Sequence, residues 1–323
     1  MRIFVTGGNG FIGSAVVRRL VESGHQVVCL LRPTSKTDRI DAFPVERAMG
    51  DVRDAASLRE AMKGCDATVH LAGLSSWSEI DSPALGDVVE GGTRNILDAA
   101  AELPGHRVVV VSSATAINGS EEPKVFDETT EFTLNDPSLT YARAKCRAEE
   151  LCAEAFAKGV QVIVVNPAEV YGPHDTGLIT AGNLIDFAKS NPVLVCNGGT
   201  SVVHVDDVAA GIVAALEKGR AGERYILGGE NLEIRDLAAL TLQLLGKRTK
   251  IISVPNGLLR FVSRAALRFR VPLPYNPHVI PYATRYWFVD ASKAQRDLGI
   301  AFRNAQQTLQ PTIAWLRESG HIA

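Results

Sequence analysis

The sequence has little of what marks several large classes of protein. Its five cysteines are odd in number and form no Cys-x-x-Cys pair, which argues against a disulfide framework or a structural zinc site and fits a reducing compartment. Its 34 lysines and arginines face 36 aspartates and glutamates, for a net charge of −2, so we expect no nucleic-acid partner. Apolar runs such as 108–111 and 162–165 are far too short to cross a bilayer.

Metal sites and secretion signals are equally scarce. The seven histidines are scattered without paired spacing, so we expect no metal site. Strand-like residues 3–6 follow Arg2 directly, with no apolar leader before them. With 46% hydrophobic residues among 323, the chain is expected to fold into one large or two interlocked domains. We therefore expect a globular protein of the cytoplasm.

The first half of the chain alternates between strand and helix patterns. Continuous valine-rich runs, typical of parallel strands buried on both faces, occur at 3–6, 26–31, 67–72, 107–112 and 160–166. Helical patterns separate them at 12–21, at 55–63 after the predicted N-cap Asp54, at 84–102 and at 138–158. This alternation predicts an α/β fold with a doubly wound parallel sheet.

The pattern changes after residue 166. Proline and glycine become frequent between 167 and 199, and helices are expected at 204–218, 234–245 and around 309–319. Strand-like runs at 224–227 and 250–254 lie between them. We assign residues 1–166 plus 203–229 to the sheet domain, and residues 167–202 plus 230–323 to a smaller, interrupted domain with the C-terminal helix.

A glycine-rich turn lies between the first strand and the first helix. The segment TGGNGFIG (6–13) satisfies GxGxxG through Gly8, Gly10 and Gly13, and TGxxGxxG through Gly7, Gly10 and Gly13. At this position the backbone N–H groups and the helix dipole can face a diphosphate. The turn therefore predicts a Rossmann site for a dinucleotide, the alternative being a tight turn without a ligand.

The end of the second strand indicates which dinucleotide is bound. A site for NAD usually presents an acidic residue there, but this chain has Arg32, with Lys36 and Arg39 close behind. A guanidinium suits a 2′-phosphate through paired, charge-assisted hydrogen bonds. We expect NADP(H) to be preferred, with NAD(H) possible. The alternative is a solvated Arg32 that stacks on the adenine.

Three further residues form a candidate catalytic set. Tyr141 and Lys145 are four residues apart near the start of a helix, so their side chains share a face. Upstream, Ser112 and Ser113 end a buried strand, where ligands gather in such sheets. The glycine-rich turn, the two serines and Tyr-x-x-x-Lys occur in this order along the chain, and the combination is a more specific sign of a catalytic site than any one motif. The alternative is that Tyr141 and Lys145 are a pair on a helix surface without a chemical role.

With these motifs the sequence resembles the extended short-chain dehydrogenases/reductases, the NAD-dependent epimerase/dehydratase superfamily, along nearly its whole length. The matching segments are TGGNGFIG (6–13), GDVRD (50–54), HLAG (70–73), GTRN (92–95), VSSA (111–114), YARAK (141–145), NPAEVYGP (166–173) and VHVDDVA (203–209). Within the superfamily it is most similar to dihydroflavonol-reductase-like members, and it shares LLRPTS (30–35), GERYILGGENL (222–232) and AWLRESGHI (314–322) with a group of hopanoid-associated sugar epimerases.

The resemblance implies a role for each site residue. Tyr141 would be the general acid or base, with its pKa lowered by Lys145 and by a cationic nicotinamide, and Ser113 would donate a hydrogen bond to the substrate oxygen. Lys145 would also hold the nicotinamide ribose. The implied cofactor-binding residues are Gly7, Gly10, Phe11, Ile12, Gly13, Arg32, Lys36, Asp51, Val52, Leu71, Ala72, Gly73, Lys145, Asn166 and Pro167. The implied substrate residues are Ser113, Thr115, Tyr141 and Tyr171.

Three departures from the family pattern bear on the reaction. Val89 stands where many members have asparagine, Asn166-Pro167 replaces the Arg-Pro of sugar-nucleotide enzymes, and Ala114 follows Ser113 where dehydratases carry an acidic pair. They favour an NADP(H)-dependent oxidoreductase that reduces a ketone or aldehyde, or oxidises the alcohol. The alternatives are an NAD(P)-dependent epimerase or dehydrogenase acting on a sugar or sterol-like molecule, and a cofactor-binding regulatory protein with little turnover.

Weaker signals complete the expectations. Residues 258–270 form a basic amphipathic stretch, which we interpret as a helix over the substrate pocket rather than a membrane contact. His70 and His204 are interpreted as structural. An aromatic cluster at 282–288 is expected in the core, with a pocket wall as the alternative. The resemblance also implies a homodimer formed through the helices at 84–102 and 138–158.

Overall fold

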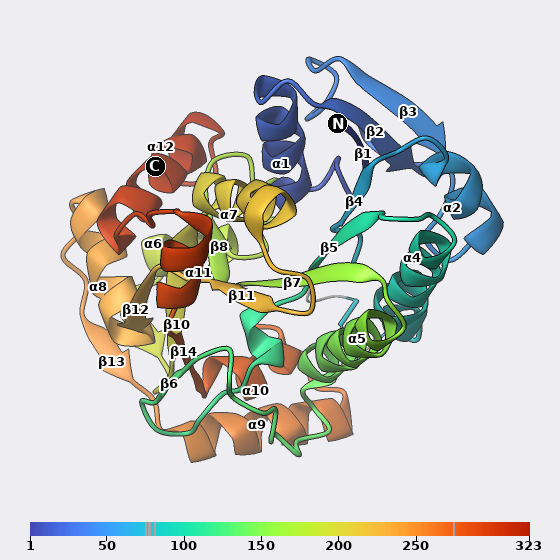
Figure 1. Cartoon of the computed structure of the whole chain (residues 1–323). Coiled ribbons are helices and arrows are strands. Elements are labelled where there is room, and N and C mark those ends of the chain that lie inside the picture. Colours follow the sequence, from blue (N-terminus) through green and yellow to red (C-terminus); the bar gives the residue numbers. More distant parts are fainter. Residues whose placement is uncertain (75, 77–78, 81, 274) are drawn as a thin grey trace.

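A seven-stranded parallel sheet forms the larger part of the molecule. The computed structural model describes residues 1–74, 76, 79–80, 82–273 and 275–323 (Figure 1). The strand order is β11-β7-β5-β4-β1-β2-β3, and every neighbouring pair is parallel. The strands are β1 (Arg2–Thr6), β2 (Gln26–Leu31), β3 (Val45–Met49), β4 (Ala67–His70), β5 (Arg107–Val111), β7 (Gln161–Pro167) and β11 (Arg224–Leu227). The predicted doubly wound sheet is confirmed.

Helices cover both faces of this sheet (Figure 1). In β1, Ile3 and Val5 pack in one apolar cluster and Phe4 in another, because successive side chains of a strand point to opposite faces. The first cluster also contains residues of α1 (Phe11–Glu22), α7 (Val205–Lys218) and α11 (Ser292–Leu298). The second contains residues of α2 (Ala55–Met62), α4 (Gly92–Ala101) and α5 (Thr140–Ala157). As predicted, Asp54 caps α2 by accepting from Ala56 N and Ser57 N.

Two elements differ from the sequence-based expectation. The edge strand β3 was not predicted, because its sequence VERAM is partly exposed and lacks the continuous apolar run of a strand buried on both faces. The helix expected at 84–102 is divided into α3 (Ala84–Gly86), the π-helical turn η1 (Asp87–Gly91) and α4. At Gly92 a side chain would meet Val52 Cγ2 at 2.9 Å, so close packing against the chain after β3 requires glycine there.

A smaller region is built around a second sheet. Its strands are ordered β12-β10-β14-β6, with β8 paired to β10. The bounds are β6 (Val125–Phe126), β8 (Glu169–Tyr171), β10 (Gly199–His204), β12 (Glu230–Glu233) and β14 (Tyr286–Val289). A separate pair is formed by β9 (Val193–Val195) and β13 (Ile251–Ser253). The strand β6 comes from within residues 1–166, so both parts of the chain contribute to this sheet.

Helices enclose the smaller sheet. An apolar cluster joins residues of α6 (Ala181–Lys189), α8 (Ile234–Leu245) and α12 (Ala305–Glu318). The remaining elements are η2 (Ala114–Ala116), α9 (Asn256–Phe269), η3 (Pro277–Val279) and α10 (Ile280–Ala283). None of the helices in the described part of the chain is long and apolar enough to span a membrane.

Candidate active site

One cavity of about 920 Å³ runs from the glycine-rich turn to the smaller sheet. The strand order reverses between β1 and β4, the place where ligands bind in doubly wound sheets. Most of the predicted site residues line the cavity, namely Gly7, Gly10, Phe11, Ile12, Gly13, Arg32, Asp51, Val52, Leu71, Ala72, Gly73, Ser113, Thr115, Tyr141, Lys145 and Pro167. Lys36, Asn166 and Tyr171 do not line it, and their surroundings are described below.

The glycine-rich turn is shaped to receive a diphosphate. Gly7 has a positive φ of 69°, and a Cβ there would lie 2.8 Å from Ala72 N. A Cβ on Gly13 would lie 2.0 Å from Gly7 O. Helix α1 begins directly after Gly10 without a side-chain cap, so its first N–H groups face the cavity side of the turn. A cradle that any side chain would fill fits the diphosphate of NAD(P).

The adenine end of the cavity carries a mixed charge. Asp51 accepts from the Arg53 Nε at 3.0 Å and the Arg53 Nη2 at 2.8 Å. These hydrogen bonds lower the pKa of Asp51 to about 2, with a smaller contribution from the charge of Arg32. Lys36 is exposed, and its backbone carbonyl accepts from Asn9 Nδ2 at 2.9 Å. Of the three basic residues named after β2, Arg32 and Arg39 line the cavity and Lys36 does not.

Arg39 links this end to the smaller region. Its Nη2 donates to His174 O at 2.8 Å and to Thr176 Oγ1 at 2.5 Å, and its Nη1 reaches Asn9 O at 3.4 Å. The glycine-rich turn is therefore tied to the loop after β8. Asp175 in that loop is buried, and its charge partly offsets the lowering of the Arg39 pKa by burial.

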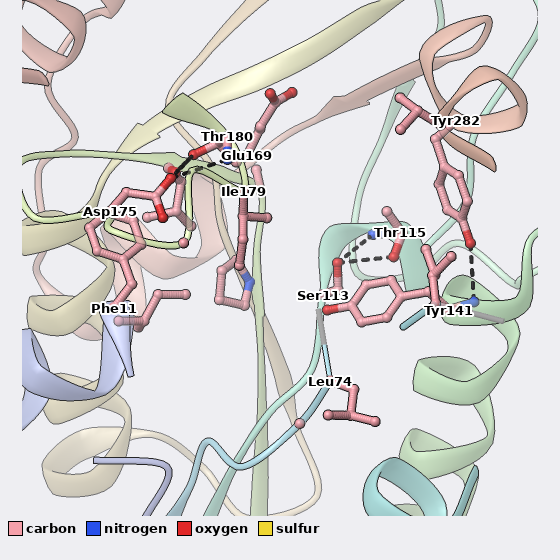
Figure 2. A pocket seen from close by; sticks show the side chains of 18 of the residues that line it. Phe11, Leu74, Ser113, Thr115, Tyr141, Glu169, Asp175, Ile179, Thr180 and Tyr282 are labelled. Atoms are coloured by element: carbon pink, nitrogen blue, oxygen red, sulfur yellow. Dashed lines mark hydrogen bonds between the residues drawn. The ribbon is translucent and has the colours of Figure 1, made fainter. Parts of the chain in front are cut away.

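The three predicted catalytic residues meet in the middle of the cavity. In Figure 2 the Tyr141 phenol points toward the Ser113 side chain, which accepts from Thr115 N at 3.2 Å and Thr115 Oγ1 at 2.9 Å. Lys145 is buried on the same face of α5, and its Nζ lies 5.9 Å from the Tyr141 ring centroid. Tyr282 fixes the start of this helix by accepting from Tyr141 N at 3.1 Å.

Burial controls the protonation of the tyrosine and the lysine. It raises the pKa of Tyr141 to about 12, and hydrogen bonding with Ser113 offsets only part of this. It lowers the pKa of Lys145 to about 8. Lys145 alone does not lower the pKa of Tyr141, at which burial dominates, and the Lys145 Nζ donates to Val111 O at 2.9 Å.

A buried carboxylate beneath the site was missed by sequence reasoning. Glu149 lies one turn after Lys145 and accepts from Ser112 Oγ at 2.5 Å, Asn166 Nδ2 at 2.6 Å and Arg224 Nη1 at 3.3 Å. Burial raises its pKa. Its spacing of four residues from Lys145 was the available signal, but glutamates at that spacing are common on exposed helix faces.

Asn166 and Tyr171 support the site from behind the cavity wall. Asn166 is fully buried and also donates to Ser113 O at 3.0 Å. Tyr171, expected to touch the substrate, is fully buried and donates to Glu169 Oε1 at 2.6 Å. Glu169, its partner, lines the cavity instead.

Both histidines singled out by the sequence are structural. His70 is buried between Thr6 Oγ1 at 2.7 Å and Thr93 Oγ1 at 3.3 Å, and burial lowers its pKa to about 3. The side chain of His204 caps α7 by accepting from Asp206 N at 3.1 Å.

The far end of the cavity is lined mainly by apolar side chains, with polar ones among them. On the side opposite Ser113 and Tyr141, Figure 2 shows Phe11 and Ile179 together with Asp175, Glu169 and Thr180. The aromatic cluster at 282–288 is buried, and two of its members, Tyr282 and Trp287, also line the cavity. Further apolar lining comes from Phe187, Val193, Val195, Leu237, Val254, Leu259, Val279 and Ile280.

Comparison with known proteins agrees with this site. The NAD dependent epimerase/dehydratase family matches residues 3–228. A Synechocystis protein provisionally named dihydroflavonol 4-reductase is 31% identical over 99% of this chain and 95% of its own length. Sterol demethylase protein B of Methylococcus capsulatus is 30% identical over 100% of both. A DesIV double mutant, a dTDP-glucose 4,6-dehydratase from Streptomyces venezuelae solved with NAD, has a TM-score of 0.78 at 26% identity over 98% and 97% of the two chains.

The family match covers the glycine-rich turn, the serine strand end and the Tyr141–Lys145 helix in a single stretch. The chain therefore belongs to the NAD-dependent epimerase/dehydratase family, the extended short-chain dehydrogenases/reductases, and is an NAD(P)-dependent oxidoreductase or epimerase.

Proposed function

We propose that the protein is an NADP(H)-dependent reductase of an apolar ketone or aldehyde, or the dehydrogenase of the corresponding alcohol. The observation that carries the proposal is the position of Tyr141 and Ser113. Both face the cavity where its glycine-lined end meets its apolar end. A carbonyl carbon placed there would lie beside the cofactor, with the rest of an apolar substrate extending toward Tyr282 and Trp287.

The chain's own residues fit the proton transfer that such a reduction needs. A bound nicotinamide supplies the hydride. Because the pKa of Tyr141 is about 12, its phenol holds a proton at neutral pH and can donate it to the substrate oxygen. The Ser113 hydroxyl donates a hydrogen bond that stabilises the developing negative charge on that oxygen. Lys145 would hold the nicotinamide ribose.

The absence of one family feature favours reduction over sugar chemistry. Ala114 follows Ser113, so the acidic pair of the dehydratases has no counterpart. The name of the Methylococcus capsulatus relative points to a sterol, which agrees with an apolar cavity end. We further propose NADP(H) as the preferred cofactor through Arg32, a homodimer of the cytoplasm formed through α4 and α5, and the two domains assigned from the sequence.

An NADPH-oxidation screen of the purified protein tests the proposal, after a check for bound cofactor. Apolar ketones and aldehydes should be reduced with stoichiometric loss of NADPH. Tyr141→Phe should lower turnover by roughly 10²–10⁴ and leave NADPH affinity nearly unchanged, because the phenol oxygen donates only in the reaction. Turnover of a sugar nucleotide with tightly held NAD and no net change in nicotinamide would show an epimerase. Tight NADPH binding without turnover of any compound would show a regulatory protein.

A further inference from the structure

Helix α9 exposes an apolar surface to solvent. Six of the twelve large apolar side chains that are exposed in the described part of the chain lie between Leu258 and Val271. Phe261 and Phe269 are 70% and 74% exposed, whereas only Ser263 and Ala266 of this helix are buried. In Figure 1, α9 lies at the edge of the molecule, away from the larger sheet. Apolar side chains gathered on one helix, unlike scattered ones, indicate a contact surface.

Four of the exposed large apolar residues share one side of the helix, and Leu267 lies on the opposite side. Leu258, Phe261, Val262, Ala265 and Phe269 follow the three- and four-residue spacing of a single face. Arg260, Arg264 and Arg268 follow at intervals of four on the adjacent side. Residues 256–271 contain no aspartate or glutamate. The helix is therefore amphipathic and basic.

Three arginines of this surface have no acidic partner. Among the described residues, none forms a hydrogen bond or ion pair with the side chains of Arg264, Arg268 or the following Arg270. Arg260 differs, because it donates to Thr284 Oγ1 at 2.9 Å and pairs with Glu121 at 2.5 Å. Arg260 holds the helix to the protein, while the other three leave their positive charge available to a partner.

The inner side of the same helix forms part of the cavity wall. Leu259 lines the cavity, as does Val254 just before the helix. Leu194 lines it as well, is 62% exposed, and pairs in register with Ile252 of β13, the strand that leads into α9. Apolar side chains therefore continue from the outer surface to the substrate end of the cavity.

We propose that α9 docks the protein on an anionic lipid surface, from which the cavity takes its apolar substrate. Phenylalanines beside unpaired arginines match a bilayer that offers an apolar interior beneath negatively charged headgroups. This replaces our expectation of a helix that only covers the pocket. The claim about the substrate rests on the proposed reductase function, whereas the claim about lipid binding does not.

Vesicle flotation with the full-length protein tests the docking. The protein should float with vesicles of phosphatidylcholine mixed with phosphatidylglycerol, and much less with phosphatidylcholine alone or at high salt. Arg264→Glu with Arg268→Glu should weaken binding to the mixed vesicles by more than about tenfold. Phe261→Ser with Phe269→Ser should weaken it by about tenfold or more.

Matched controls separate this surface from general effects. Arg19→Glu with Arg248→Glu changes the net charge equally, at exposed positions outside α9, and should leave vesicle binding unchanged. Met49→Ser with Val125→Ser removes two other exposed apolar side chains and should also leave vesicle binding unchanged. Circular dichroism and NADPH binding should show that all four double variants remain folded.

Two results would overturn the proposal. The first is wild-type protein that does not float with mixed vesicles while it binds and oxidises NADPH normally, which would leave the proposed function intact. The second is a dimer in light scattering that is lost in the Phe261→Ser, Phe269→Ser variant while vesicles have no effect. That result would make the α9 surface an interface between two copies of the chain. Vesicle binding without carbonyl reduction would instead contradict the proposed function alone.

Discussion

We propose that the preference between NADPH and NADH depends on Arg32. It lies just after β2 and lines the cavity. Arg32→Glu should weaken NADPH binding at least about tenfold, because a charge-assisted pair is lost and a carboxylate repels the 2′-phosphate. NADH binding should change much less. Fluorescence titration with both nucleotides measures this difference. Equal weakening of NADPH and NADH would show that Arg32 does not contact a 2′-phosphate.

Lys36 provides the matched comparison for Arg32. It carries the same charge four residues later, but it is exposed and does not line the cavity. Lys36→Glu should therefore weaken NADPH binding less than Arg32→Glu does. An equal loss would mean that long-range charge, rather than a direct contact, selects the cofactor.

Lys145 should make stability depend on pH. Burial lowers its pKa from 10.5 to about 8, so between these values the unfolded chain binds more protons and stability rises with pH. Below this window both states are protonated, and the cost of burying the charge applies in full. Lys145→Met should therefore be more stable than wild type near neutral pH, with a difference that shrinks toward about pH 10.

Urea unfolding at the two pH values checks this prediction. Lys158→Met, at the exposed end of the same helix, should show no comparable gain at either pH. A gain for Lys145→Met that is as large at the higher pH as near neutrality would contradict the lowered pKa.

Sequence patterns identified the site residues that lie within one short segment of the chain. Tyr141 and Lys145 share a helix face, and Ser113 follows a buried strand, so short segments were enough to single them out as candidates. The role of Glu149 and the contact of Arg39 with His174 were not recognised, because the partners Arg224 and His174 are 75 and 135 residues away. Tyr171 was misplaced for a related reason. Tyr171 and Glu169 lie on the same side of β8, and tertiary packing, which no local pattern specifies, buries the Tyr171 ring and leaves Glu169 at the cavity wall.

At the scale of elements, helix α5 joins the predicted catalytic residues Tyr141 and Lys145 to the sheet. Its residue Glu149 accepts from side chains on the loop after β5, on β7 and on β11. Glu149→Leu leaves Arg224 and Asn166 without this acceptor, so the free energy of unfolding should fall by about 3 kcal/mol. Glu154→Leu on the exposed part of the same helix should change it by less than about 0.5 kcal/mol. Urea unfolding that gives equal losses would contradict a structural role for the buried carboxylate.

Strands that are buried on both faces were predictable, because such burial requires a continuous run of apolar residues. The five central strands were found from continuous apolar runs, whereas β3 at the edge has Glu46 and Arg47 exposed and left no such run. The two-residue strand β6 was also missed. Its pairing with β14 joins residues more than 160 positions apart, and no local pattern specifies such a contact.

At the scale of the whole molecule, the two sheets share one core. Ile3 and Val5 of the larger sheet belong to the same apolar cluster as Val170 and Val203 of the smaller sheet. Arg39 adds a polar link between the glycine-rich turn and the loop after β8. Unfolding of the larger sheet would therefore expose apolar residues of the smaller sheet, even though α6, α8 and α12 also share an apolar cluster of their own.

This shared core predicts that both regions unfold in one cooperative transition, and that a bound cofactor raises the temperature of the whole transition. NADPH at a hundredfold excess over its Kd should raise the free energy of unfolding by about 2.7 kcal/mol, because only the folded cavity binds it. Calorimetry should show a single peak that moves to higher temperature with NADPH, and Arg32→Glu should move less at the same concentration. Two peaks, of which NADPH moves only one, would show instead that the cofactor-binding and substrate-binding regions unfold independently.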